Sequence, residues 1–204
     1  MEEYDSIHTD ALGRFEARTS VLSKFGWLQS AICDEWSTAW IAYIEQACAT
    51  VLKAKKPRFI FQPTFDIDNT FSYANKNKIR SFLAEIKDLI YQRKERLHDR
   101  RKVRNGLQPD PYDTFDQISD IAAHFPETKV FWLLGNYTKR DKNLSHLNSA
   151  QQTKIKQVAA HAEIGIHGSS LTAHQLQQYQ IEIERLGQIT GYQPLCNRQH
   201  FLLM

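Results

Sequence analysis

The chain has 204 residues, of which 42% are hydrophobic and 24% charged, so it is long enough to bury a core as one domain or one and a part. Its formal net charge of +3 is too small to indicate a general attraction to nucleic acid. No apolar stretch is long enough to span a bilayer, the N-terminus lacks the apolar core of a signal peptide, and the three cysteines, Cys33, Cys48 and Cys196, show no C-x-x-C spacing. We therefore expect a cytoplasmic protein with reduced thiols, either buried or inert, and no membrane association.

The first 56 residues are predicted to be helical. In residues 34–48 the large apolar side chains recur at helical spacing, which places Trp36, Trp40, Tyr43 and Ile44 on one face. Such a face is typical of a core contact or a docking surface. The lysines within residues 53–56 and the proline after them predict the end of this segment.

From residue 57 onward, predicted strands alternate with predicted helices. Strands are expected from Phe59 to the Asp66 region and at residues 130–135, 163–167 and 195–203, with helices at residues 76–96, 149–160 and 172–189. The basic run at residues 93–104 contains no interleaved aromatic residues, so we expect a solvated and mobile helix end and not a nucleic-acid surface. The alternation predicts an α/β fold with a parallel sheet, in which the chemistry lies at the carboxyl ends of the strands.

Charged and imidazole side chains occur where these strands end. Asp66 and Asp68 are two residues apart, so in a strand they point the same way, and two adjacent like charges require a metal, a proton or a cationic partner. His167 ends a later strand, and Arg198 and His200 lie on the last one. One Asp with two neutral His side chains suits Zn²⁺ or a similar divalent ion. The bland alternatives are a solvated strand end for the Asp pair and a hydrogen-bonded core role for each His.

At these residues the chain resembles the polysaccharide deacetylase superfamily (NodB-homology, carbohydrate esterase family 4-like). More narrowly, it is similar to a bacterial branch in which this domain follows a domain of unknown function. The resemblance is carried by Thr-Phe-Asp-Ile-Asp at residues 64–68, by the strand that ends in His167, and by Arg-Gln-His-Phe at residues 198–201. Residues 110–115 and 136–141 also look like this branch.

The resemblance implies a metal-dependent hydrolase that removes N- or O-acetyl groups from a carbohydrate. It implies that Asp66 is the general base, oriented by Arg198, and that Asp68 and His167 bind a divalent ion such as zinc. Leu171 stands where the superfamily usually has a second metal-binding His. We therefore expect His200 to be the third ligand, and not His174, which falls inside a predicted helix.

The resemblance also implies the architecture. Residues 57–204 would form a polysaccharide-deacetylase-like domain, a partial (β/α) barrel, and residues 1–56 would be the end of the preceding domain. The superfamily barrel has about seven strands, so with four predicted strands we expect this domain to be truncated at its C-terminus. The later motif that supplies a catalytic His acid is not among these residues.

Two other functions are compatible with the same residues. Asp66, Asp68 and Thr70 satisfy the Asp-x-Asp-x-Thr pattern of haloacid-dehalogenase-type phosphatases, in which Asp66 would be the nucleophile and Asp68 the general acid in the presence of Mg²⁺. That function leaves His167 and Arg198 without a role. The second alternative is a catalytically incomplete domain that binds a glycan or a protein partner.

Overall fold

The computed structural model describes residues 9–52 and 58–203. The chain divides into two compact units, Met1–Ile60 and Phe61–Met204. The lysine-rich end predicted for the helical segment, at residues 53–57, lies outside the described residues, as do residues 1–8.

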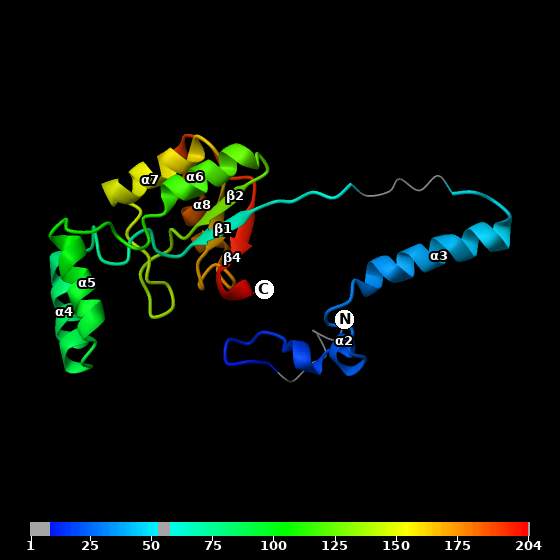
Figure 1. Ribbon diagram of the computed structural model, residues 1–204, viewed down its shortest axis with the longest axis horizontal. Helices are drawn as coiled ribbons and strands as arrows, with labels where there is room; N and C mark the ends of the chain where they lie inside the picture. Colours follow the sequence, from blue (N-terminus) through cyan, green and yellow to red (C-terminus); the bar gives the residue numbers. More distant parts are fainter. Residues whose placement is uncertain (1–8, 53–57, 204) are drawn as a thin grey trace. The chain divides into compact units, whose positions relative to one another are not determined.

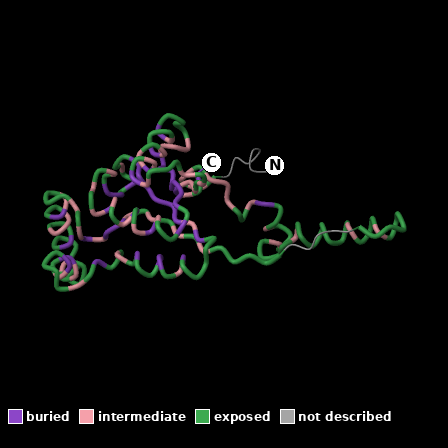
Figure 2. The backbone as a smooth tube through the Cα atoms, turned by 90° about the horizontal axis from the view of Figure 1, so that it is seen from above, coloured by how far each residue is buried: buried purple, intermediate pink, exposed green. Residues whose placement is uncertain are grey.

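The first unit is helical in part. It contains the 3-10 helix η1 (Ala17–Thr19), the short helix α2 (Val21–Lys24) and the long helix α3 (Ile32–Cys48). No residue of α3 is buried, and Figure 2 draws this helix mostly in green. The predicted aromatic face therefore lies in solvent within the described part of the chain, with Trp36 and Trp40 exposed by 54% and 62%.

The second unit is built on a curled sheet of four parallel strands, as Figure 1 shows. The strands are β1 (Thr64–Ile67), β2 (Lys129–Trp132), β3 (Glu163–Gly168) and β4 (Asn197–Gln199). Each strand pairs with the next one along the chain, in the order β1-β2-β3-β4. This arrangement confirms the predicted α/β fold with a parallel sheet, and it is consistent with part of a barrel.

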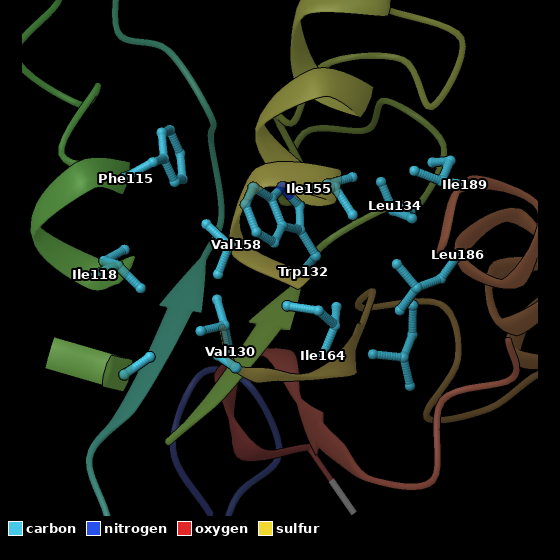
Figure 3. Packing of buried hydrophobic residues seen from close by; sticks show 13 residues of the cluster. Phe115, Ile118, Val130, Trp132, Leu134, Ile155, Val158, Ile164, Leu186 and Ile189 are labelled. Carbon is cyan, nitrogen blue, oxygen red and sulfur yellow. The ribbon is translucent and has the colours of Figure 1, made fainter. Parts of the chain in front are cut away.

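One face of the sheet is covered by the helices α6 (Phe115–His124), α7 (Ser149–Ala159) and α8 (Leu176–Thr190). Alternate residues of the central strands point into this layer, where Trp132 and Ile164 are fully buried (Figure 3). The ring of Phe115 stacks on that of Trp132 with 5.3 Å between centroids. Burial of each such side chain contributes roughly 1.5–3 kcal/mol. Because strand side chains alternate, the residues between them point to the opposite face of the sheet.

Several predicted boundaries were wrong. The strand predicted from Phe59 begins only at Thr64, where pairing with Lys129 starts, and Phe59 is 87% exposed. The last strand contains Asn197–Gln199 alone and passes into the 3-10 helix η2 (His200–Leu202). Sequence analysis also missed α6, although its buried side chains at positions 115, 118 and 122 follow helical spacing.

The basic run does not form a solvated extension of one helix. The predicted helix over residues 76–96 is two helices, α4 (Lys78–Ile90) and α5 (Lys94–Arg104), which contact each other. The chain reverses at Gln92, whose φ is 52°. Arg100 is only 3% exposed and donates to Asp88 at 2.7 Å, with its guanidinium 5.0 Å from the centroid of the Tyr73 ring. A buried ion pair therefore holds α5 against α4.

Two further features concern the exposure of the cysteines and the length of the helices. Cys33 and Cys48 are exposed free thiols and Cys196 is partly exposed, so of the two expected states, buried or inert, the first two cysteines are not buried. Within the described residues, no helix has both the length and the apolar character needed to cross a bilayer.

The Asp88–Arg100 pair gives a stability prediction. We expect Asp88→Asn to lower the free energy of unfolding by about 3 kcal/mol, because it leaves a buried guanidinium without its counter-charge. Glu85→Gln is the matched control: Glu85 pairs with Arg104 in a partly exposed position, so its loss should cost less than about 1 kcal/mol. Urea denaturation followed by circular dichroism measures both values. Equal effects of the two variants would contradict the role of the buried pair.

Candidate metal centre

Three side chains meet at the carboxyl edge of the sheet. Asp68 directly follows β1, His167 lies in β3, and His200 directly follows β4. Nε2 of His167 lies 3.2 Å from Oδ1 of Asp68, and Nε2 of His200 lies 3.5 Å from the same oxygen. One ligand atom from each residue falls within 4.8 Å of the other two. The structure thus brings together the three residues predicted to bind a metal.

Strand register explains this convergence. Asp66 is in register with Phe131, and Phe131 with Gly165, so residues 66, 68, 165 and 167 all point away from the helical layer. His167 is in register with Arg198, which places the end of β4 beside the end of β3. His200 then begins η2, where Phe201 has a φ of 60° and its ring stacks on the imidazole of His200 with 3.9 Å between centroids.

The second nitrogen of each imidazole is already hydrogen-bonded. Nδ1 of His167 lies 2.8 Å from the backbone oxygen of Arg198, and Nδ1 of His200 lies 2.9 Å from Oδ1 of Asp141. A carbonyl oxygen only accepts, so Nδ1 of His167 carries a hydrogen, which leaves Nε2 as the nitrogen that faces Asp68 and that a metal ion would bind. Carbonyl and carboxylate partners of this kind orient metal-binding histidines in proteins.

Asp141 is the residue that sequence analysis failed to assign. It is fully buried, and it accepts hydrogen bonds from the backbone N–H and the hydroxyl of Ser170 at 3.0 and 2.5 Å and from the hydroxyl of Thr138 at 3.0 Å. These donors fix the carboxylate that binds His200. A single Asp in a polar loop carries no spacing signal of its own.

Asp66 and Arg198 form a second contact beside the cluster. Nη1 of Arg198 donates to Oδ1 of Asp66 at 2.9 Å and to the hydroxyl of Thr64 at 3.1 Å. The guanidinium also lies over the ring of Phe131, 4.5 Å from its centroid. These contacts fix the position of Arg198 and orient the carboxylate of Asp66.

The charges of the cluster depend on one another. Hydrogen bonds from His167, and then from His200, hold the pKa of Asp68 well below its usual range. Burial acts to lower the pKa of His200, but its hydrogen bonds with Asp141 and Asp68 outweigh burial and raise this pKa to about 9. In the metal-free protein at neutral pH, His200 is therefore an imidazolium between two carboxylates.

The geometry fits a divalent ion. Two ligand atoms that each lie at about 2.0–2.1 Å from a tetrahedral ion are about 3.4 Å apart, and the two His–Asp68 distances are 3.2 and 3.5 Å. Two imidazole nitrogens and one carboxylate oxygen form a donor set that zinc accepts, with a further position left for water or substrate. The side chain of Asp68 is 55% exposed, so that position faces solvent.

His174, the rejected alternative ligand, lies elsewhere. It is exposed in a turn that precedes α8, whose first residue is Leu176, so the expectation that it sits within a helix was wrong. Across residues 9–52 and 58–203, no second group of His, Cys, Asp or Glu side chains is arranged to hold a metal ion.

Comparisons of the chain with protein-family models, with curated proteins and with solved structures found no match.

The ligand assignment predicts a graded series of zinc affinities. His200→Ala and His167→Ala each remove a ligand and should lower zinc affinity by orders of magnitude, whereas Asp141→Asn removes only the partner that orients His200 and should lower it about 10–100-fold. His174→Ala is the control and should bind zinc like the unmodified chain. Competition with a chromophoric chelator measures each affinity. Loss of zinc in His174→Ala with retention in His200→Ala would show that the assignment is wrong.

Zinc binding should also release protons. A ligating imidazole is neutral, so at pH 7 the ion must displace the proton that His200 carries in the metal-free protein. We expect His200 to contribute about one released proton at pH 7 and progressively fewer as the pH rises through 9, where the imidazole becomes neutral by itself. Calorimetric titration in two buffers with different ionisation enthalpies counts the protons. The count should fall by about one in His200→Ala, and an unchanged count would contradict the protonated state.

Proposed function

We propose that this chain belongs to a metal-dependent hydrolase that removes N- or O-acetyl groups from a carbohydrate, as the polysaccharide deacetylases it resembles do. The observation that carries the proposal is the Asp68–His167–His200 cluster with the Asp66–Arg198 pair on the same face of the sheet. A metal-binding group beside a separately oriented carboxylate is what hydrolysis of an acyl group by water requires.

Each residue has a distinct role in this proposal. A divalent ion held by Asp68, His167 and His200 supplies Lewis-acid polarisation of the acyl carbonyl and lowers the pKa of water. Asp66 accepts the proton of the attacking water as general base, and Arg198 holds one of its carboxylate oxygens so that the other is directed at the water. Asp141 keeps His200 in place from outside the site.

The phosphatase alternative is less well supported by the contacts. Mg²⁺ prefers oxygen ligands, whereas Asp68 is flanked by two imidazoles. The proposed nucleophile of that reaction, Asp66, is engaged by Arg198. An incomplete binding domain would share the metal centre but would not release acetate.

Asp66→Asn tests the chemistry. We expect it to lower the rate of acetate release from N-acetylglucosamine oligomers, or from an acetylated ester substrate, by at least 100-fold, the usual contribution of a general base. Zinc content should stay unchanged, because Asp66 does not face the ion in this assignment.

Asp113→Asn, which removes a carboxylate that pairs with Lys154 away from the cluster, is the control and should retain activity. Loss of zinc in Asp66→Asn would reverse the roles of Asp66 and Asp68. A zinc-loaded protein that releases no acetate would support the binding domain, and hydrolysis of a phosphomonoester with Mg²⁺ would support the phosphatase.

A further inference from the structure

A cavity of about 530 Å³ opens among the loops that follow β1 and β2. Its lining comes from residues 75–77 and Arg80, from Gly135 and the two residues after it, and from residues 143–146 and 148. This volume is in the range of small-molecule sites. None of the functional residues assigned above lines it.

The cavity has positive charge and no carboxylate among its described lining residues. Lys76 and Arg80 are both half-buried. The helices α4 and α7 begin at this cavity, with Asn77 and Asn148 as their N-caps, and the N-terminus of a helix adds partial positive charge.

The charges that act on Lys76 are mostly positive, and its Nζ donates to the backbone oxygen of Ser72. Burial, and then the charges of Arg80 and Arg100, lower the pKa of Lys76 to about 8. The nearest opposing charge, Asp110, already accepts hydrogen bonds from four backbone N–H groups of residues 72, 73, 74 and 112. An anionic ligand would favour the charged form of Lys76.

Asn143 contributes a buried acceptor. It is 3% exposed, and its Nδ2 donates to the backbone oxygens of Gly135 and Leu144 at 2.8 and 3.0 Å, which fixes the orientation of the amide. Its Oδ1 is buried without a hydrogen-bond partner among the described residues. The buried amide therefore fixes the loop that forms this wall of the cavity.

An aromatic ring completes the lining. Tyr137 is 61% exposed, and the guanidinium of Arg80 lies 4.4 Å from the centroid of its ring. An exposed ring of this kind offers an apolar face to the C–H groups of a sugar. The loop that carries Asn143 also carries Asp141, the partner of His200, so the cavity and the metal centre share one structural element.

We propose that this cavity binds an acidic saccharide, with a carboxylate or phosphate held by Lys76 and Arg80 beside the N-termini of α4 and α7 and with the sugar ring against Tyr137. The identification of this saccharide as the substrate of the metal centre rests on the proposed deacetylase function. Its binding to the cavity does not depend on that function.

The test compares four probes on the full chain: glucuronic acid, glucose 6-phosphate, glucose and inorganic phosphate, with affinities measured by NMR titration. We expect at least one acidic sugar to bind at least tenfold more tightly than glucose and than inorganic phosphate. The two acidic sugars distinguish a carboxylate from a phosphate ligand.

Lys76→Gln and Arg80→Gln should each weaken the binding of the acidic sugar about tenfold. Lys78→Gln removes an exposed neighbouring charge that does not line the cavity and should leave it unchanged.

Three results would overturn the proposal. These are equal affinities for glucose and the acidic sugars, phosphate binding as tight as that of glucose 6-phosphate, and equal losses in Lys78→Gln and Arg80→Gln. Arg80→Gln serves alone if Lys76→Gln does not fold. Saccharide binding without acetate release would contradict the deacetylase function but not the proposed saccharide site. Acetate release with no preference for acidic sugars in binding would contradict only the proposed saccharide site.

Discussion

At the carboxyl edge of the sheet, two carboxylates bind the same imidazole. Asp68 and Asp141 both hydrogen-bond to His200, one through Nε2 and the other through Nδ1. Without a positive charge between them, the two carboxylates would repel each other and lose hydrogen-bond donors. A proton on His200 supplies that charge in the metal-free protein, and a divalent ion on Nε2 can replace it. This shared contact joins the end of β1 and the end of β4 to the loop that carries Asp141.

Periodicity predicted where the site residues lie, whereas their roles came from the family resemblance. Asp66 and Asp68 alternate with apolar residues at a strand end, and His167 ends another apolar strand, so the face of each side chain followed from a period of two. Parallel pairing of consecutive strands then placed these ends at one edge. His200 was the harder assignment, because it lies in a 3-10 turn and not in the predicted strand. The predicted position of His200 at this edge of the sheet is still correct, because β4 pairs with β3 up to Gln199.

The unpredicted parts depend on contacts between distant residues. Asp141 reaches His200 across 59 positions in the chain, and no local pattern distinguishes it from other loop carboxylates. The basic helix α5 was misread for the same reason: composition suggests a solvated segment, but Asp88 and Tyr73 bury Arg100. At residues 59–61 the opposite error occurred, because a strand was predicted where the chain forms none. Their apolar side chains favour a strand, but Phe59 and Ile60 remain exposed because no neighbouring strand pairs with them.

The loop after β2 connects these observations to function. It is anchored at one end by Asn143, which donates to the oxygen of Gly135, and in its middle by Asp141, which accepts from Ser170. Gly135 has no space for a side chain, since an added Cβ would lie 2.5 Å from the Cβ of Ser169. The loop is therefore packed tightly against the segment that follows His167. Asn143 and Asp141 therefore place one wall of the cavity and the partner of His200 on the same loop.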